Sequence, residues 1–312
     1  PDGKVEPGRK LTVAGPGGRG ASNPCGLAFA PGEKRAFVCL SRNNTLAVLD
    51  LESGKVIQEI PVGVAPYDVV LFAAGKRAFV SNWGGRRPNP GERAAASAGT
   101  DTLVDERGVA ASGTVSVVDL EAGIELSQVP TGLHPCDLEL SPDQQRLFVA
   151  NANSDSVTVI EVSSLKVAET IAVRPDEGLA FGSAPNALSV SGDGTRLFVA
   201  NGGNNAVAVI GLAAGPAQTS RLEGFIPTAW FPGAVLNHGA HLYIANVKGF
   251  GSRNPQPDRK GWNSHWHLGT VSKVEIPDGS TLAAYTRQVK EDARVPQMLR
   301  AWETLRRGGK PV

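Results

Sequence analysis

One phrase of this sequence is written twice. RLFVANANSDSVTVIEV at 146–162 returns as RLFVANGGNNAVAVIGL at 196–212. Weaker copies share its aromatic position, which falls at Phe37, Phe79, Phe148, Phe198 and Tyr243. Most of these intervals are close to the about 40–50 residues that one β-propeller blade occupies, and internal repetition limits the fold more strongly than any other sequence signal.

The copies also share an order of local signals. Each has a Pro-containing start, a short apolar run, a turn rich in Gly or Asp, the repeated phrase, and two further β-branched runs. Runs of this kind are typical of strands, and their turn residues tolerate positive φ or cap their own backbone. A single four-stranded sheet leaves both faces uncovered, and stacking copies around an axis buries them. The sequence therefore predicts an all-β fold, a β-propeller of four-stranded antiparallel blades.

Five copies are complete, and the predicted propeller covers residues 1–289. The predicted blades span these ranges: 24–63, 65–132, 134–174, 184–225 and 229–289. The N-terminal GKVEPGRKLTVAG matches the outer-strand phrase GKVIQEIPVG at 54–63, so residues 1–14 are predicted to be the outer strand of a further, partial blade. A smaller ring closed by this strand is the alternative.

The C-terminal segment 290–312 has a different pattern. Met298, Trp302 and Leu305 fall on one face of a helix, Pro296 suits its first turn, and Gly308 suits its end. We expect a short C-terminal helix followed by a linker.

The repeats SPDQQRLFVANANSDSVTVIEV and SGDGTRLFVANGGNNAVAVIGL resemble the YVTN-type β-propeller repeat, over about residues 20–289. The last copy, with IPTAWFPGAV and LYIANVKGFGSRNPQP, resembles the propeller half of bacterial proteins that fuse such a propeller to an alkaline-phosphatase-superfamily phosphoesterase. The resemblance implies a seven-bladed ring, a chain that is a segment of a longer one, and a C-terminal phosphoesterase-like domain as partner after residue 312. It also implies a periplasmic or extracellular location. None of the metal-binding motifs of that enzyme can be located in this chain.

Composition gives no sign of a nucleic-acid or membrane partner. The formal net charge is +1, which argues neither for nucleic acid nor for a charged membrane surface, and we expect no nucleic-acid partner. No apolar run approaches the about 18 residues of a membrane span. The three cysteines do not form a disulfide framework, and we expect Cys25, Cys39 and Cys136 to be small buried side chains.

The copies differ mainly in three loops, at 83–113, 174–186 and 247–269. Propeller geometry places all three on one face of the ring. Long loops on a rigid scaffold usually carry binding functions. This face is therefore the predicted functional surface.

Cationic, aromatic and amide side chains are concentrated in these loops. Arginine forks and aromatic plates suit an anionic or sugar-like ligand, or an acidic protein surface. Packing of the loops on each other or on a following domain would use the same residue types, so both interpretations stay open. The predicted ligand- or partner-binding residues are Trp83, Arg86, Arg87, His134, Arg253, Asn254, Lys260, Trp262, His265, Trp266 and His267.

Two functions are compatible with these features. The first is a non-catalytic binding module, and the second is a propeller enzyme, a lactonase or quinone-type oxidoreductase, with its site at the channel mouth. The second needs acids or a metal converging on the axis, and the blade starts offer only a thin set: Asn23, Asp68, His134, Asp137 and Asn186. The HWH run at 265–267 has no acidic or thiol residue near it at a spacing typical of a metal site. We predict the binding module, with no catalytic residue, no metal site and no cofactor.

Overall fold

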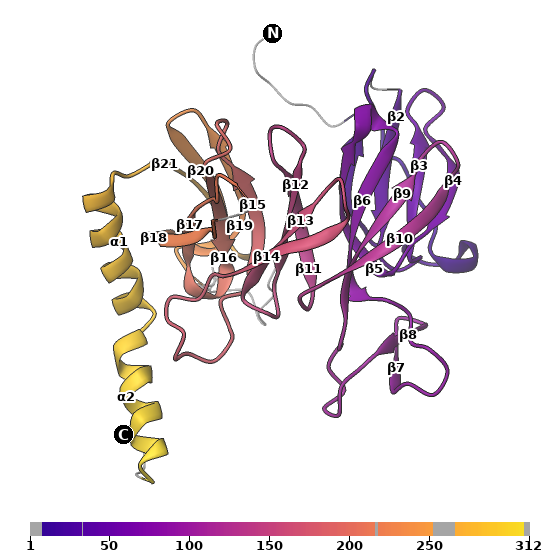
Figure 1. Ribbon diagram of the computed structural model, residues 1–312. Helices are drawn as coiled ribbons and strands as arrows, with labels where there is room; N and C mark the ends of the chain where they lie inside the picture. Colours follow the sequence, from indigo (N-terminus) through magenta and orange to yellow (C-terminus); the bar gives the residue numbers. More distant parts are fainter. Residues whose placement is uncertain (1–7, 33, 216–217, 252–265, 309–312) are drawn as a thin grey trace.

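The computed structural model describes residues 8–32, 34–215, 218–251 and 266–308. Five antiparallel sheets follow one another in chain order, and Figure 1 shows them standing side by side from the indigo N-terminal sheet to the orange one. The innermost strands of consecutive sheets contact each other throughout the series. This radial stacking of antiparallel sheets is a β-propeller architecture, as the repeat predicts.

Four sheets have four strands, and all four run from the inner to the outer strand in chain order. They comprise β1 (Pro24–Phe29), β2 (Arg35–Leu40), β3 (Thr45–Asp50) and β4 (Lys55–Pro61); β5 (Val64–Phe72), β6 (Arg77–Gly85), β9 (Gly113–Asp119) and β10 (Ile124–Thr131); β11 (Pro135–Leu140), β12 (Arg146–Asn151), β13 (Ser156–Glu161) and β14 (Lys166–Ala172); and β15 (Pro185–Val190), β16 (Arg196–Asn201), β17 (Ala206–Gly211) and β18 (Arg221–Pro227). The fifth sheet comprises β19 (Trp230–His238), β20 (His241–Gly249) and β21 (Thr270–Glu275). Short 3-10 turns are η1 (Pro16–Gly18), η2 (Ala73–Gly75) and η3 (Gly202–Asn204).

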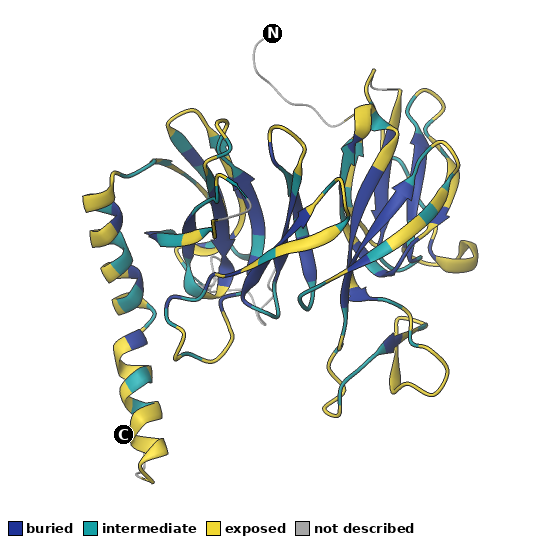
Figure 2. Ribbon diagram, viewed as in Figure 1, coloured by how far each residue is buried: buried dark blue, intermediate teal, exposed yellow. Residues whose placement is uncertain are grey.

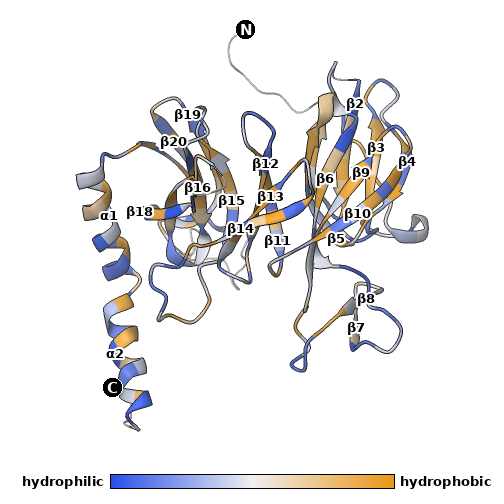
Figure 3. Cartoon of the chain, viewed as in Figure 1, coloured by the Kyte–Doolittle hydropathy of each residue, from blue (hydrophilic) through white to orange (hydrophobic). Residues whose placement is uncertain are grey.

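The repeated phrase forms the second strand of each sheet. In β12 and β16 every residue after the leading arginine is buried, because neighbouring sheets cover both faces. This explains why RLFVAN is continuously apolar up to its Asn and does not alternate. Figures 2 and 3 show dark blue and orange residues in the middle strands, and Figure 2 shows more exposed residues on outer strands such as β14.

The asparagine that ends this phrase joins the second strand to the third. Asn151 Nδ2 donates to Ser156 Oγ at 3.2 Å and to Thr158 Oγ1 at 2.9 Å. Asn82 and Asn246 donate in the same way to hydroxyls of β9 and β21. The recurrent Asn is therefore a structural residue that satisfies buried hydroxyls.

A second recurrent polar residue links three of the blades to the blade that follows. Asn44 and Asn205 adopt left-handed conformations, with φ of 57° and 51°, in the turn after the second strand. Asn44 Oδ1 accepts from the backbone N–H of Ala65 at 2.9 Å, and Asn205 Oδ1 accepts from that of Phe231 at 2.9 Å. Asp155 does the same for the start of the fourth blade. These contacts cap the first residues of the following inner strand.

The fifth blade differs from the four strands predicted for it. Within the described residues its sheet has three strands, and helix α1 (Gly279–Asp292) forms where the last part of 229–289 was expected to complete the blade. Asp278 caps this helix by accepting from the Thr281 N–H at 2.7 Å, a typical N-terminal signal. The helix packs on β18, and Leu282 and Val289 join the hydrophobic core.

The N-terminal segment also differs from its predicted strand. Residues 8–13 form no strand, and Ala14 makes only an isolated bridge with Ala21. Leu11 and Val13 nevertheless pack against the outer face of the first sheet. Residues 1–7 of the predicted strand 1–14 lie outside the described residues.

The expected C-terminal helix is confirmed as α2 (Val295–Arg306). Pro296 lies in its first turn, and Gly308 beyond its end has φ of 75°. Figure 1 shows α1 and α2 running along one side of the molecule. Neither helix is long and apolar enough to cross a membrane, nor is any other helix in the part of the chain that is described.

Candidate functional site

The longest described insertion leaves the second blade between β6 and β9. It folds into a small hairpin, β7 (Ala94–Ser97) and β8 (Thr100–Leu103), which projects from the propeller. Figure 1 shows this hairpin at the same end of the molecule as the loop between β14 and β15. Two of the three variable loops therefore share one face, as the repeat geometry predicts. Most of the third, at 247–269, lies outside the described residues.

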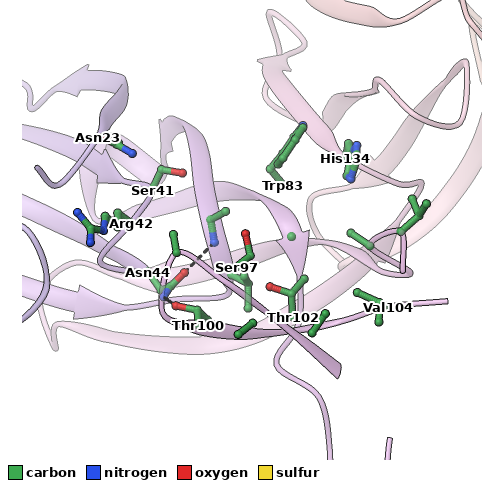
Figure 4. Close-up of a pocket in the computed structure, with 18 of the residues that line it drawn as sticks. Asn23, Ser41, Arg42, Asn44, Trp83, Ser97, Thr100, Thr102, Val104 and His134 are labelled. Atoms are coloured by element: carbon green, nitrogen blue, oxygen red, sulfur yellow. Dashed lines mark hydrogen bonds between the residues drawn. The ribbon is translucent and has the colours of Figure 1, made fainter. Parts of the chain in front are cut away.

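The hairpin forms one wall of a partly open cavity of about 500 Å³ over the first and second blades. Alanine and valine side chains supply most of the wall on the insertion side, from Ala95 to Val109. Polar groups come from the turn after β2 and from the hairpin (Figure 4). A volume of this size suits a small organic ligand.

Trp83 and His134 lie together at the edge of this cavity, as Figure 4 shows. Their rings are stacked, with centroids 4.1 Å apart and planes inclined by 23°. Next to them, Cys136 Sγ lies 3.2 Å from the His134 carbonyl oxygen, to which it donates. The structure thus brings together two of the predicted site residues from different blades.

The imidazole of His134 is not a ready cation. Burial lowers the pKa of His134 below its usual value of 6.5. The neutral ring is therefore favoured at neutral pH, and it serves the site as an aromatic plate.

Arg86 and Arg87 have different surroundings. Arg86 Nη1 lies 2.6 Å from Glu92 Oε2 and its Nη2 lies 2.7 Å from Oε1, a bidentate pair. These hydrogen bonds and the Asn89 N–H hold the pKa of Glu92 at about 2. Arg86 thus stabilises its own loop, while Arg87 is exposed. Their predicted part in ligand binding stays a prediction.

The cavity also has residues that sequence reasoning did not select. Asn44 Nδ2 donates to Thr100 Oγ1 at 2.8 Å, which ties the hairpin to the first blade. Arg42 lines the same space, in the turn where the other copies carry Asn153 and Gly203. That single Arg in an otherwise small or polar turn was the available signal. The hairpin residues carried none, because their place over the first blade depends on tertiary contacts.

Five predicted site residues lie outside the described residues, so their placement stays a prediction. They are Arg253, Asn254, Lys260, Trp262 and His265. Trp266 and His267 are described, are half-buried, and come just before β21. Neither is part of the cavity lining.

The inner strands hold a second group of ionisable side chains. Asp68 Oδ2 accepts from the Leu138 N–H at 3.0 Å, and Asp137 Oδ2 accepts from the Leu188 N–H at 2.6 Å. The two carboxyls also lie close enough that each affects the pKa of the other. Burial raises the pKa of both, and the nearby Asp68 charge raises that of Asp137 further. Each carboxyl therefore joins its own inner strand to the next one.

Burial also acts on Glu139, where it raises the pKa to about 7. Among the described residues, no three His, Cys, Asp or Glu side chains converge as a metal site would require. The cysteines are only partly as expected. Cys39 and Cys136 are buried, but Cys25 is exposed, so the prediction for Cys25 was wrong.

Comparison with known proteins shows similarity of fold only. No protein-family model matches the chain, and no curated protein matches it. One similar solved structure is hydrazine synthase of Kuenenia stuttgartiensis, with 16% identity, a TM-score of 0.47, and coverage of 81% of this chain and 84% of that one. Another is a functionally unknown protein from Desulfotomaculum acetoxidans DSM 771, with 14% identity, a TM-score of 0.52, and coverage of 72% of this chain and 63% of that one.

Proposed function

We propose that this chain is a non-catalytic β-propeller binding module whose working surface is the face that carries the variable loops. One observation supports this most directly. The insertion between β6 and β9 folds back over the blade starts and lines with them a partly open cavity of about 500 Å³. An insertion that only lengthened a turn would not need the contact between Asn44 and Thr100.

The alternative, an enzyme acting at the axis, has less support. Its best candidates are Asp68 and Asp137, which have raised pKa values. Perturbed carboxyls often mark active sites, but structural networks perturb them too. Here each carboxyl accepts from a backbone N–H of the next inner strand, so both are occupied in joining blades.

The parent protein is a further part of the proposal. The resemblance of the repeats supports a phosphoesterase-like domain as the partner of this module, in the same chain or in another protein, and a periplasmic or extracellular location. The loop face would then serve the partner domain, a ligand, or both. The coding sequence that follows residue 312 tests this association directly.

A turnover assay tests the non-catalytic proposal. The purified chain is treated with chelator, resupplied with divalent metals, and assayed on phosphoesters and lactones. We expect no turnover above buffer. Turnover that disappears in Asp137→Asn but survives replacement of 87–111 by a short turn would overturn the proposal and establish the axial site.

A further inference from the structure

The cavity between the first two blades has walls of unequal chemistry. Figure 4 shows Arg42 and Asn44 on one side, and Trp83, His134 and Val104 on the other. The wall between them is largely alanine and valine. A ligand that fills this space therefore meets a cationic, polar end and an aromatic, apolar end.

Arg42 supplies the positive charge at the polar end. Within the described residues its guanidinium has one hydrogen bond, a long one from Nη1 to the Ala21 carbonyl at 3.4 Å, and no acidic side chain there forms an ion pair with it. A guanidinium at a cavity that has no acidic partner suits a carboxylate, which it can bind through two N–H groups. His134 is favoured as neutral and does not compete for the anion.

Of the polar side chains beside Arg42, one is already hydrogen-bonded within the protein and another is available to a ligand. Asn44 is engaged through both side-chain atoms, with Thr100 and with the Ala65 N–H. Thr102 Oγ1 is buried and has no hydrogen-bond partner among the described residues. A buried hydroxyl without a partner is unusual in a folded protein, and Thr102 belongs to the cavity lining.

The opposite end favours a flat ring. Trp83 is stacked on His134 and remains 42% exposed, so part of its indole is open to a further contact. The adjoining alanine and valine side chains offer few partners for the hydroxyls of a sugar. A largely apolar ring matches these walls better than a polyhydroxylated one.

We propose that this cavity binds a small aromatic carboxylate, with the carboxylate on Arg42 and the ring toward Trp83. This inference rests on the proposed function, because it assigns a ligand class to the same loop face. It assigns Arg42, Thr102 and the β7–β8 hairpin to the site.

Calorimetric titration of the purified chain tests the proposal. The probes are benzoate and 4-hydroxybenzoate, with benzamide, glucuronate and inorganic phosphate as comparisons. We expect both aromatic acids to bind and benzamide to bind at least tenfold more weakly. Arg42→Gln should weaken benzoate at least tenfold. Arg35→Gln, at the opposite end of β2 and exposed, is the matched control and should change nothing.

Other results overturn the inference in distinct ways. Equal affinity for benzamide and benzoate, or unchanged affinity for benzoate in Arg42→Gln, would show that Arg42 does not bind the carboxylate. If glucuronate or phosphate binds more tightly than benzoate, the cavity does not prefer an aromatic ring. No binding of benzoate at 10 mM removes the ligand class. A different result is that another probe binds and that its binding is abolished by Ala96→Trp, which fills the cavity. That result would contradict the aromatic carboxylate and still support a binding module with its site in this cavity. Only turnover overturns the module itself.

Discussion

The rings of Trp83 and His134 are stacked across two blades, with centroids 4.1 Å apart. His134 has φ of 52° and begins the third blade, at the position that Ala65 and Phe231 hold in theirs. Those two residues are capped by an Asn of the preceding blade. At His134 the preceding blade contributes the aromatic contact instead, because its turn has become the β7–β8 insertion.

Removal of the indole should affect both stability and titration. Trp83→Ala is expected to lower the free energy of unfolding by about 1–2 kcal/mol, because a stacked aromatic pair is lost. The His134 pKa should rise toward 6.5, since exposure reduces its desolvation. Urea denaturation and an NMR titration of the His134 ring measure the two effects.

The sign of the associated pH effect follows from linkage. A histidine with a lowered folded-state pKa contributes stability that is present above pH 6.5 and is lost as pH falls through the folded pKa. Trp83→Ala should reduce this loss. Trp302→Ala, on an exposed position of α2, is the control, and an equal shift of the His134 pKa there would contradict the assignment.

Asp155 offers a test of the caps between blades. Its buried carboxylate accepts from the backbone N–H groups of Gly182, Ser183 and Ala184. Asp155→Ala leaves these donors without their acceptor and should cost about 3 kcal/mol of unfolding free energy in urea denaturation. Asp155→Asn installs the residue that Asn44 and Asn205 provide elsewhere.

The Asn variant is the matched comparison because it keeps the Oδ1 acceptor. It should lose about 1 kcal/mol, chiefly through the second oxygen and the Arg174 ion pair at 3.6 Å. Equal losses in the Ala and Asn variants would show that the cap does not act through this oxygen.

Glu139 gives a pH-dependent prediction. Its pKa rises from 4.5 to about 7 on folding, so its contribution is fully present below about pH 4.5 and is lost as pH rises through about 7. Glu139→Gln should match the wild type in Tm at pH 4.5 and exceed it at pH 8. A Tm difference that is the same at both pH values would contradict this.

The contact between α1 and the fourth blade depends on a glycine. A Cβ at Gly224 would collide with Thr286 Oγ1 and lie 2.9 Å from Leu282 Cγ. Gly224→Ala should therefore cost about 1–3 kcal/mol and increase hydrogen exchange in α1. Gly192→Ala, where an added Cβ has no neighbour within 4 Å, should leave exchange in α1 unchanged.

The sheets could be predicted from the repeat because both faces of the second strand are buried. Burial on both faces requires a continuous run of apolar residues, which is visible in the sequence. Helix α1 was missed because the run from 281 to 289 was assigned to a blade. Its local signal, the capping Asp278, was present but competed with the expectation of a fourth strand. Local chemistry, not the repeat, determined that segment.

The candidate site was predictable only in part. Trp83 was selected because it begins a variable loop, and His134 because it starts the third blade on the same face; the structure stacks their rings. The cavity itself joins the turn at Arg42 to a hairpin more than 50 residues away. Only the fold brings these segments together, so no spacing rule could reveal the pair Asn44 and Thr100.

The insertion between β6 and β9 does not disturb the pairing of these two strands. Arg77 pairs with Asp119 and Asn82 with Thr114 across β6 and β9, in the register that Arg146 and Glu161 and then Asn151 and Ser156 show in the blade without an insertion. The added segment thus leaves the hydrogen-bonding register of β6 and β9 unchanged. The entropic cost of closing a loop also rises only slowly with its length. We therefore expect that residues 86–112 can be replaced by another loop while the pairing of β6 with β9 is kept.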